Sequence, residues 1–456
     1  MPNAMPAERF FATPGMTAAF SPQAHVRRML LFEAALARAE ARASIIPDAA
    51  AEAIAAACRV ELYDVAALYQ DAALAGTLAI PLVRALTDRV EDEAKRFVHW
   101  GATSQDAIDT ALVLQMRDGL DLLLADLHPI ATRCASLAER HRRTPMAGRT
   151  LLQQALPITF GLKAARWLGL VTRQIHRLRE VREQAMVVQF GGAAGTLASL
   201  GDRGLDVAEL VGEELGLAVP DLPWHAERDR IAEVASALGV LAGGMAKIAA
   251  DVLLLRQTEV GEVTEEEVPG KGGSSAMPHK HNPVDATMAV AAARLAIGAV
   301  PVVLGAMAQE HERAAGGWQA EWEALPALFR HTAGAVARVR ETIGGIVVNP
   351  ERMRANLDLT GGLVMAESLT TALAANLGRS ASYELVQLLT KRAAAVGTDL
   401  RSIALADEQV RSVLSRDAID RAFDPLTYLG SADAFIDRAL VAYRGLDSPG
   451  YGVSRY

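Results

Sequence analysis

Five long stretches of this chain repeat apolar residues at intervals of three and four positions. In the most regular stretch, Ile231 to Leu255, the two intervals alternate over the whole length. The other stretches begin at Ile108, after Pro157, after Pro283 and at Leu325. This spacing places an apolar stripe along one side of a long α-helix. Five such stripes are more than a small monomer can bury, so we expect a helical bundle that is shared between subunits.

The composition also favours helices over sheets. Hydrophobic residues make up 51% of the 456 residues, aromatic residues only 5%, and alanine is abundant. Alanine has a high helix propensity and little preference for strands. We therefore predict an all-α protein with an N-terminal helical domain (1–105), a central long-helix domain (106–354) and a C-terminal helical domain (355–456). Pro301 is expected to kink the fourth long helix, and residues 448–456 are expected to form a loose tail.

Charge and cysteine content exclude several classes of protein. A net charge of −8 argues against a nucleic-acid partner, which needs a basic face. Cys58 and Cys134 are too few for a disulfide framework and suit a reducing cytoplasm. The first 16 residues lack the charged and apolar segments of a signal peptide. No run of 18 residues is wholly apolar, so we expect no membrane span.

The loop from Gly270 to Pro283, GKGGSSAMPHKHNP, concentrates polar chemistry on a glycine-rich backbone. It carries two hydroxyls, two histidines, the Lys280 ammonium and the Asn282 amide, and it leads into the start of a helix. A mobile linker is the plainer interpretation of its composition. A loop of this kind is also suited to closing over a small anion. His279 and His281 have no carboxylate or cysteine at ligand spacing, so we expect no metal site.

Three other segments combine polar residues with helix boundaries. In residues 99–106, HWGATSQD, Thr103 or Ser104 can cap the following helix, whose N-terminus can also hold a carboxylate. Residues 190–196 are glycine-rich but follow no strand, so we expect a turn beside the site instead of a dinucleotide loop. Residues 309–313, QEHER, are expected near the end of the fourth long helix.

These segments together resemble the fumarase/aspartase superfamily. Residues 273–283, GSSAMPHKHNP, resemble its G-S-S-x-M-P-x-K-x-N signature, and residues 99–106 resemble H-x-G-x-T-S-x-D. Residues 148–153 resemble G-x-T-H-x-Q, but Leu151 stands in the place of the histidine. QEHER, followed by W-x-x-E-W-E, resembles the branch that lactonises 3-carboxy-cis,cis-muconate.

The resemblance implies a fold and a set of functional residues. The implied fold is a homotetramer whose subunits each contribute five helices to a twenty-helix core, with sites shared between subunits. Ser274 matches the catalytic acid, with Ser275 as its alternative, and Lys280 can stabilise its oxyanion. The residues implied in substrate binding are His99, Thr103, Ser104, Thr150, Gln153, Ser275, Asn282 and Arg313.

Leu151 indicates which reaction to expect. A lyase that releases an amine or hydroxide needs help with that group's proton, whereas a substrate carboxylate that attacks its own double bond does not. We therefore expect a cycloisomerase instead of a lyase. The resemblance implies that it belongs to aromatic-acid degradation and acts on a small tricarboxylate without metal or organic cofactor. The alternatives are an adenylosuccinate-lyase-like elimination that releases fumarate, a cycloisomerase for a sulfonated muconate, and a catalytically silent structural homologue.

Overall fold

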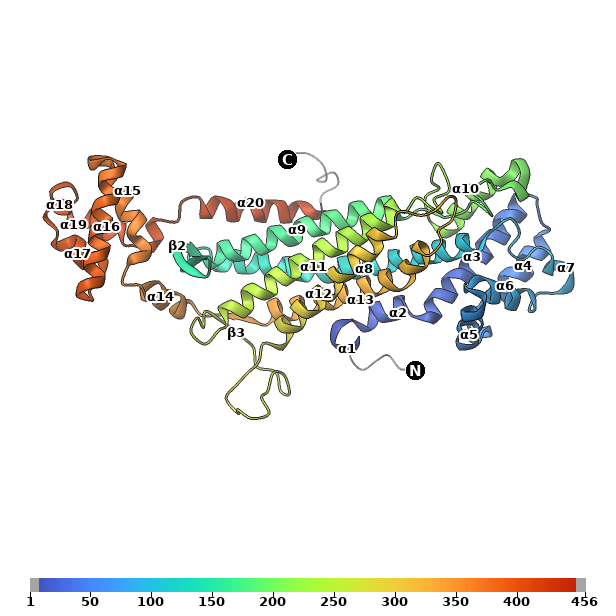
Figure 1. Cartoon of the computed structure of the whole chain (residues 1–456), viewed down its shortest axis with the longest axis horizontal. Helices are drawn as coiled ribbons and strands as arrows, with labels where there is room; N and C mark the ends of the chain where they lie inside the picture. Colours follow the sequence, from blue (N-terminus) through green and yellow to red (C-terminus); the bar gives the residue numbers. More distant parts are fainter. Residues whose placement is uncertain (1–7, 448–456) are drawn as a thin grey trace. The chain divides into compact units, whose positions relative to one another are not determined.

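The computed structural model describes residues 8–447, and most of them are helical. Five long helices occupy the five periodic stretches, which confirms the all-α prediction (Figure 1). They are α8 (Ser104–Arg140), α9 (Phe160–Ala185), α11 (Asp229–Leu255), α12 (Val284–Gly305) and α13 (Gly317–Gly344). The tail predicted for residues 448–456 lies outside the described residues, as do the first seven residues of the chain.

Shorter helices precede, interrupt and follow the long ones. Those before α8 are α1 (Glu8–Phe11), α2 (Pro14–Ala19), α3 (Pro22–Arg42), α4 (Asp48–Ala57), α5 (Val65–Ala75), α6 (Ala79–Thr87) and α7 (Asp92–Lys95). Between α9 and α11 lies α10 (Gly204–Leu215). Those after α13 are α14 (Pro350–Asp358), α15 (Ala366–Leu377), α16 (Arg379–Val396), α17 (Leu400–Ala406), α18 (Glu408–Val413), α19 (Arg416–Ala422) and α20 (Ala432–Arg444).

Two small antiparallel strand pairs accompany the helices. The first is a hairpin of β1 (Pro145–Thr150) and β2 (Gln153–Thr159), and the second pairs β3 (Val263–Glu265) with β4 (Ile346–Val348). The helical periodicity did not predict the hairpin. Its turn is made by two leucines, which lack the Asn-Gly or Asp-Gly chemistry by which a short hairpin is usually recognised.

Contacts along the chain define two compact units. Unit 1 combines Met1–Asp126, Gln174–Ala246 and Met288–Arg338, and unit 2 combines Leu127–Arg173, Lys247–Thr287 and Val339–Tyr456. Each unit contains one part of every long helix. The two units therefore do not correspond to domains that follow one another along the sequence. The three-domain division at residues 105 and 354 remains a prediction.

Small residues allow the helices of unit 1 to approach closely. A Cβ atom added to Gly119 on α8 would lie 2.8 Å from the Phe329 ring on α13. A Cβ atom added to Gly239 on α11 would lie 2.7 Å from Val300 on α12. Substituting either glycine would therefore require the neighbouring side chain or its helix to shift, because protein interiors have few voids. Small residues at these contacts therefore allow the long helices to pack closely.

In unit 2 the C-terminal helices α15 to α19 bury a core of their own. Leu369, Leu389 and Leu400 are fully buried in it. In the same unit, Trp167 is buried and donates from its indole Nε1 to Asp251 Oδ2 at 2.8 Å, which ties α9 to α11.

In the single chain, α12 exposes an unusually apolar surface. Both α11 and α12 are long and apolar enough to span a membrane by length and composition, a test that core helices of soluble proteins also pass. In the single chain only 28% of the most apolar window of α12 is buried. Its exposed apolar residues include Leu295, Ile297, Val302 and Leu304.

The fourth long helix ends earlier than the sequence pattern indicated. It continues past Pro301 but ends at Gly305, and residues 306–316 form an irregular segment. The expectation that QEHER lies near the end of the helix was therefore wrong. Left-handed backbone at His311 (φ 48°) and Gly316 (φ 120°) is incompatible with a continuous helix. The segment that carries Arg313 is a loop between α12 and α13.

Candidate active site

The start of α8 in unit 1 is held by one buried carboxylate, that of Asp106. Its Oδ2 accepts the backbone N–H groups of Thr103 at 3.0 Å and Gly192 at 2.9 Å. Its Oδ1 accepts the backbone N–H of Gly191 at 3.0 Å and lies 2.7 Å from His225 Nε2. Asp106 thereby fixes the glycine-rich segment 190–196 against the helix start, as the sequence suggested for that turn.

Arg313 reaches the same helix start from the loop after α12. Its Nη1 donates to Thr103 Oγ1 at 3.0 Å, and its Nη2 donates to the Ala193 carbonyl at 3.0 Å. The Arg313 Nε atom is buried and has no hydrogen-bond partner among the described residues. The guanidinium therefore adds its charge to the positive end of the α8 dipole beside Thr103 and Ser104. Such a site suits a carboxylate.

The His99 imidazole is a second basic group, and it precedes this helix start in the sequence. Its Nδ1 lies 2.7 Å from Glu33 Oε1 on α3, and Glu33 is almost fully buried. Burial alone lowers the pKa of His99, but the charge of Glu33 and its hydrogen bond, with a smaller contribution from Asp106, outweigh burial and raise it. The imidazole therefore retains its proton more readily than a free histidine does.

A buried ionic network lies one turn further along α8. Arg228 Nη1 donates to Asp109 Oδ2 at 2.7 Å, and its Nη2 donates to Glu321 Oε2 at 2.5 Å. Trp318 Nε1 donates to Asp109 Oδ1 at 2.9 Å. Gln309 Nε2 donates to Glu321 Oε1 at 3.3 Å and thus ties the Arg313 loop to the network. Burial raises the pKa of Glu321 despite its hydrogen bond to Arg228 and the charge of that residue.

The residues of this network were not predicted from the sequence. The sequence did contain a sign of them. Asp109 and Glu321 interrupt apolar helix faces, where an unpaired buried carboxylate is costly, so each acid needs a partner. The missing partner was Arg228, which lies 119 positions from Asp109 along the chain. A helical pattern cannot show which distant arginine neutralises a buried acid. The network holds α8, α13 and the Arg313 loop in register.

In unit 2, the hairpin carries the predicted residues Thr150 and Gln153 at its tip. The two residues are paired in register and flank the turn residues Leu151 and Leu152. Both leucines have left-handed backbone, with φ of 50° and 64°. Their exposed fractions are 96% and 81%. Strained backbone and exposed leucines are both unfavourable in an isolated chain, so this tip is a candidate for a functional contact.

The hairpin is anchored by a buried ion pair. Arg149 donates from Nη1 to Glu262 Oε2 at 2.9 Å and from Nη2 to Glu262 Oε1 at 2.7 Å. Glu262 is fully buried, and Asn356 Nδ2 donates to its Oε1 at 2.8 Å. Glu262 directly precedes β3, so the same pair also fixes the strand from which the loop that carries Ser274 departs.

The loop between β3 and α12 presents Ser274 with two backbone donors. Ser274 Oγ accepts the N–H of Met277 at 3.1 Å and lies 3.4 Å from the N–H of Ala276. Asn282 donates from its backbone N–H to the Gly272 carbonyl at 2.7 Å, which closes the loop. A Cβ atom on Gly272 would lie 2.6 Å from the Asn282 oxygen, so only glycine fits there. Donors directed at Oγ favour its alkoxide form.

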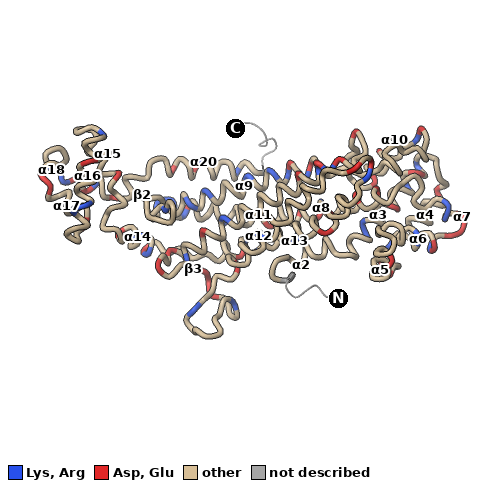
Figure 2. Tube along the Cα trace, viewed as in Figure 1, with Lys and Arg blue, Asp and Glu red and all other residues tan. Residues whose placement is uncertain are grey.

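The remaining loop residues are open to solvent. Ser275 and Lys280 are exposed, and Asn282 is partly buried. Figure 1 shows the loop extending from β3 without a helix. Figure 2 shows acidic positions on the loop near β3 and cationic positions farther from β3. The Lys271 ammonium pairs with Asp285 in the first turn of α12.

The predicted residues thus divide between the two units. Unit 1 brings together Thr103, Ser104 and Arg313, and it also contains His99. Unit 2 contains the hairpin tip and the loop that carries Ser274 as two distinct elements. In residues 8–447, no three side chains of His, Cys, Asp or Glu gather as metal ligands. The geometry suits anion binding in unit 1, and in unit 2 it directs two backbone N–H groups at the Ser274 hydroxyl oxygen.

Comparison with known proteins places this architecture in a family. The family model described as "Lyase" matches residues 8–298, and one described as "Adenylosuccinate lyase C-terminus" matches residues 362–439. The chain is 50% identical to the 3-carboxy-cis,cis-muconate cycloisomerase of Pseudomonas aeruginosa over 96% of both chains. It is 42% identical to the nitrosuccinate lyase of Streptomyces davaonensis, over 93% of this chain and 91% of the relative.

A solved structure agrees with the sequence relatives. The 3-carboxy-cis,cis-muconate lactonizing enzyme of Pseudomonas putida superposes with a TM-score of 0.92 at 45% identity. The match covers 98% of this chain and 100% of that enzyme. The "Lyase" match alone spans more than half of the chain, and the long-helix fold and the signature loop are those of one superfamily. The chain belongs to the lyase family of the fumarase/aspartase superfamily.

Proposed function

We propose that this protein is a 3-carboxy-cis,cis-muconate cycloisomerase, which closes a tricarboxylate diene to a carboxymuconolactone in aromatic-acid degradation. The observation that carries the proposal is the near full-length 50% identity to the Pseudomonas aeruginosa enzyme of that name. Identity to the nitrosuccinate lyase is lower, at 42%. The cationic site in unit 1 supports a substrate with several negative charges.

The reaction is an internal addition, so every atom of the substrate stays in the product. One substrate carboxylate attacks a carbon of the diene and forms the C–O bond of the lactone. The π electron pair moves to the neighbouring carbon, next to another carboxylate, which delocalises the charge. Ser274 then donates its Oγ proton to that carbon. The N–H groups of Met277 and Ala276 stabilise the resulting alkoxide until it is reprotonated from solvent.

The other predicted residues hold the remaining carboxylates. Arg313, the start of α8 and protonated His99 supply positive charge in unit 1. Thr150 and Gln153 supply hydrogen bonds from the exposed hairpin tip. Asn282 and Lys280 complete the loop side, and Ser275 is the neighbouring hydroxyl. Fixed donors of this kind act most strongly when closure of the loop excludes water.

Leu151 supports cyclisation over elimination. The hairpin tip carries leucine where lyases of the superfamily carry histidine, and a leucine cannot protonate a departing amine or hydroxide. Cyclisation has no departing group, and an apolar tip helps to exclude water. The substrate's attacking carboxylate is already ionised and tethered, so a base and a second binding event are both unnecessary.

We further propose a homotetramer with sites shared between subunits. The apolar surface of α12 and the strained, exposed leucines of the hairpin tip are both unfavourable in water. Burial of both against another subunit would remove this cost. A shared site also accounts for functional residues that are distributed over several distinct elements. Cys58 and Cys134 are both free thiols, which supports a cytoplasmic location.

The proposed reaction is tested by following the diene absorbance of 3-carboxy-cis,cis-muconate with purified protein and a metal chelator. We expect the absorbance to disappear and a lactone to form without fumarate. Parallel assays with adenylosuccinate, nitrosuccinate and a sulfonated muconate identify the alternative reactions. Persistent diene absorbance at high protein concentration contradicts the proposal, and fumarate release from adenylosuccinate would assign the chain to the lyases instead.

A further inference from the structure

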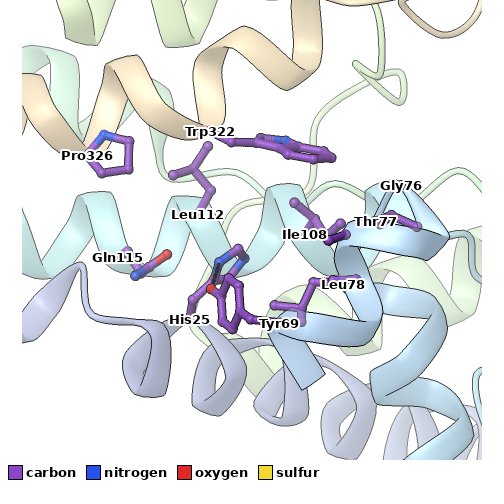
Figure 3. A pocket seen from close by; sticks show the side chains of 12 residues that line it. His25, Tyr69, Gly76, Thr77, Leu78, Ile108, Leu112, Gln115, Trp322 and Pro326 are labelled. Carbon is purple, nitrogen blue, oxygen red and sulfur yellow. Dashed lines mark hydrogen bonds between the residues drawn. The ribbon is translucent and has the colours of Figure 1, made fainter. Parts of the chain in front are cut away.

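A cavity of ≈ 430 Å³ lies in unit 1 and is lined by none of the residues assigned to the proposed reaction. Its walls include His25 from α3, Tyr69 from α5, Ile108 and Leu112 from α8, and Trp322 and Pro326 from α13. Figure 3 shows Trp322 on one side of the α8 residues and the rings of His25 and Tyr69 on the other. A cavity of this volume is in the range of small-molecule sites.

The cavity is electrically neutral. None of its twelve lining residues is Asp, Glu, Lys or Arg. The one lining histidine, His25, is uncharged at neutral pH, because burial lowers its pKa to about 4. A carboxylate that entered would lose hydration without gaining a cationic partner, which is costly. The cavity therefore discriminates against the polyanions that the Arg313 site suits.

Two nitrogen atoms in the cavity wall have an unmet capacity for hydrogen bonding. Trp322 Nε1 and His25 Nε2 are buried and have no partner among the described residues. The other His25 nitrogen, Nδ1, lies 3.3 Å from the Tyr69 hydroxyl. Leaving a buried donor unpaired costs about 1–3 kcal/mol. The indole N–H can only donate, so the group that would relieve this cost at Trp322 is an oxygen acceptor.

We propose that this cavity is a second ligand site, which binds a small neutral aromatic molecule with a carbonyl oxygen. The three aromatic side chains and the aliphatic wall favour a flat ring. The unpaired indole N–H favours an acceptor on that ring, and the lack of charge excludes the carboxylate form of the same compound. The site is distinct in its residues and in its ligand chemistry from the proposed catalytic site.

Benzamide and benzoate form a matched pair of probes, because they share a shape and differ in charge. The full-length protein is labelled with 5-fluorotryptophan, and its five tryptophans are followed by ¹⁹F NMR. The Trp322→Phe variant assigns the Trp322 signal. We expect benzamide to shift that signal saturably, while benzoate at equal concentration leaves it in place. Added carboxymuconate should not displace benzamide.

Two substitutions on α5 test the location of the site. Ala72→Phe adds a ring to the cavity wall, whereas Ala66→Phe adds one at an exposed position of the same helix that does not line the cavity. Ala72→Phe should raise the benzamide midpoint at least about tenfold, and Ala66→Phe should leave it unchanged. The other four tryptophan signals report that each variant is folded.

Three results would overturn the inference. The first is a Trp322 signal that benzamide does not shift up to its solubility limit. The second is an equal response to benzoate, which would contradict a neutral site. The third is an unchanged midpoint in Ala72→Phe, which would place the ligand elsewhere. Because none of these measurements uses turnover, they stand apart from the test of the cycloisomerase activity.

Discussion

At the scale of single residues, the anion site of unit 1 depends on one guanidinium held in a fixed orientation. Arg313 donates to Thr103 and to the Ala193 carbonyl, while its Nε atom is buried without a partner. A planar guanidinium can make these contacts and still match a carboxylate, whereas a lysine offers a single point charge.

Arg313→Lys should therefore keep the charge but lose the orientation. We expect KM for carboxymuconate to rise by roughly tenfold or more, with a smaller change in kcat, as a charged hydrogen bond is worth about 1.5–3 kcal/mol. Steady-state kinetics on the diene absorbance measure both constants. Lys280→Arg, the reverse substitution on the loop, is the matched control. An unchanged KM in Arg313→Lys would show that a positive charge at position 313 suffices for substrate binding.

His99 predicts how substrate binding depends on pH. Its pKa is raised above 6.5 by Glu33, so the protonated form persists in the folded protein at pH values where a free histidine has lost it. KM should rise as the pH increases through this raised pKa. The same proton stabilises the fold fully below pH 6.5, and that stabilisation is lost as the pH rises through the folded pKa.

Glu33→Gln removes the charge that raises the pKa of His99. The increase in KM should then begin at a lower pH than in the wild type, and the fall in unfolding free energy should move in the same direction. His99→Gln should abolish both pH dependences. A wild-type KM that does not change across this range would mean that His99 carries no charge used in binding.

Among the elements, the hairpin has an apolar tip that makes the isolated chain less stable. Leu151 and Leu152 occupy left-handed backbone, which costs a side-chain-bearing residue about 1–2 kcal/mol each. Asn-Gly at the same two positions suits such a turn much better. A chain selected for stability alone would not place two exposed leucines there.

Replacing the turn by Leu151→Asn and Leu152→Gly should remove about 1–2 kcal/mol of backbone strain from each chain, mainly at the new glycine. It should also reduce activity, because the apolar contact of the tip is lost. Denaturant unfolding measures the first effect and the diene assay the second. Leu74→Asn, at a residue of α5 that is 93% exposed, is a control for removal of an exposed leucine. Higher stability with full activity would exclude a role for the two leucines in the site.

The long helices could be predicted from the sequence, whereas the hairpin and the Arg313 loop could not, and the difference has a physical reason. A long helix repeats its apolar positions over many turns, so α8, α9, α11, α12 and α13 were all recognised from local spacing. The hairpin lies in a segment with no favourable turn residues. Helix α12 ends at Gly305, before the Arg313 segment that its apolar pattern was expected to include. The ion pairs of Arg228 and Arg149 join distant segments, which no local pattern can reveal.

At the scale of the whole molecule, the apolar surface of α12 indicates assembly. Ile297 on α12 is 44% exposed in the single chain. If this surface is buried between subunits, as the proposed tetramer requires, a carboxylate at that position would be buried without a partner. The cost of an unpaired buried charge is about 3–5 kcal/mol, which is large compared with most subunit contacts.

Ile297→Asp should therefore dissociate the oligomer and abolish activity, although it changes no residue assigned to catalysis. Light scattering after size-exclusion chromatography measures the assembly, and the diene assay measures the activity. Leu74→Asp introduces the same charge at an exposed leucine of α5 and should change neither. A monomeric, fully active Ile297→Asp variant would contradict the shared site.

The most direct measurement compares Ser274→Ala with Ser275→Ala. In the proposed mechanism the Ser274 proton reaches the substrate carbon, and a general acid of this kind contributes about 10²–10⁴-fold. We therefore expect kcat for loss of the diene absorbance to fall by about that factor in Ser274→Ala, with Ser275→Ala close to the wild type. A Ser274→Ala enzyme that turns over carboxymuconate at the wild-type rate would rule out Ser274 as the proton donor.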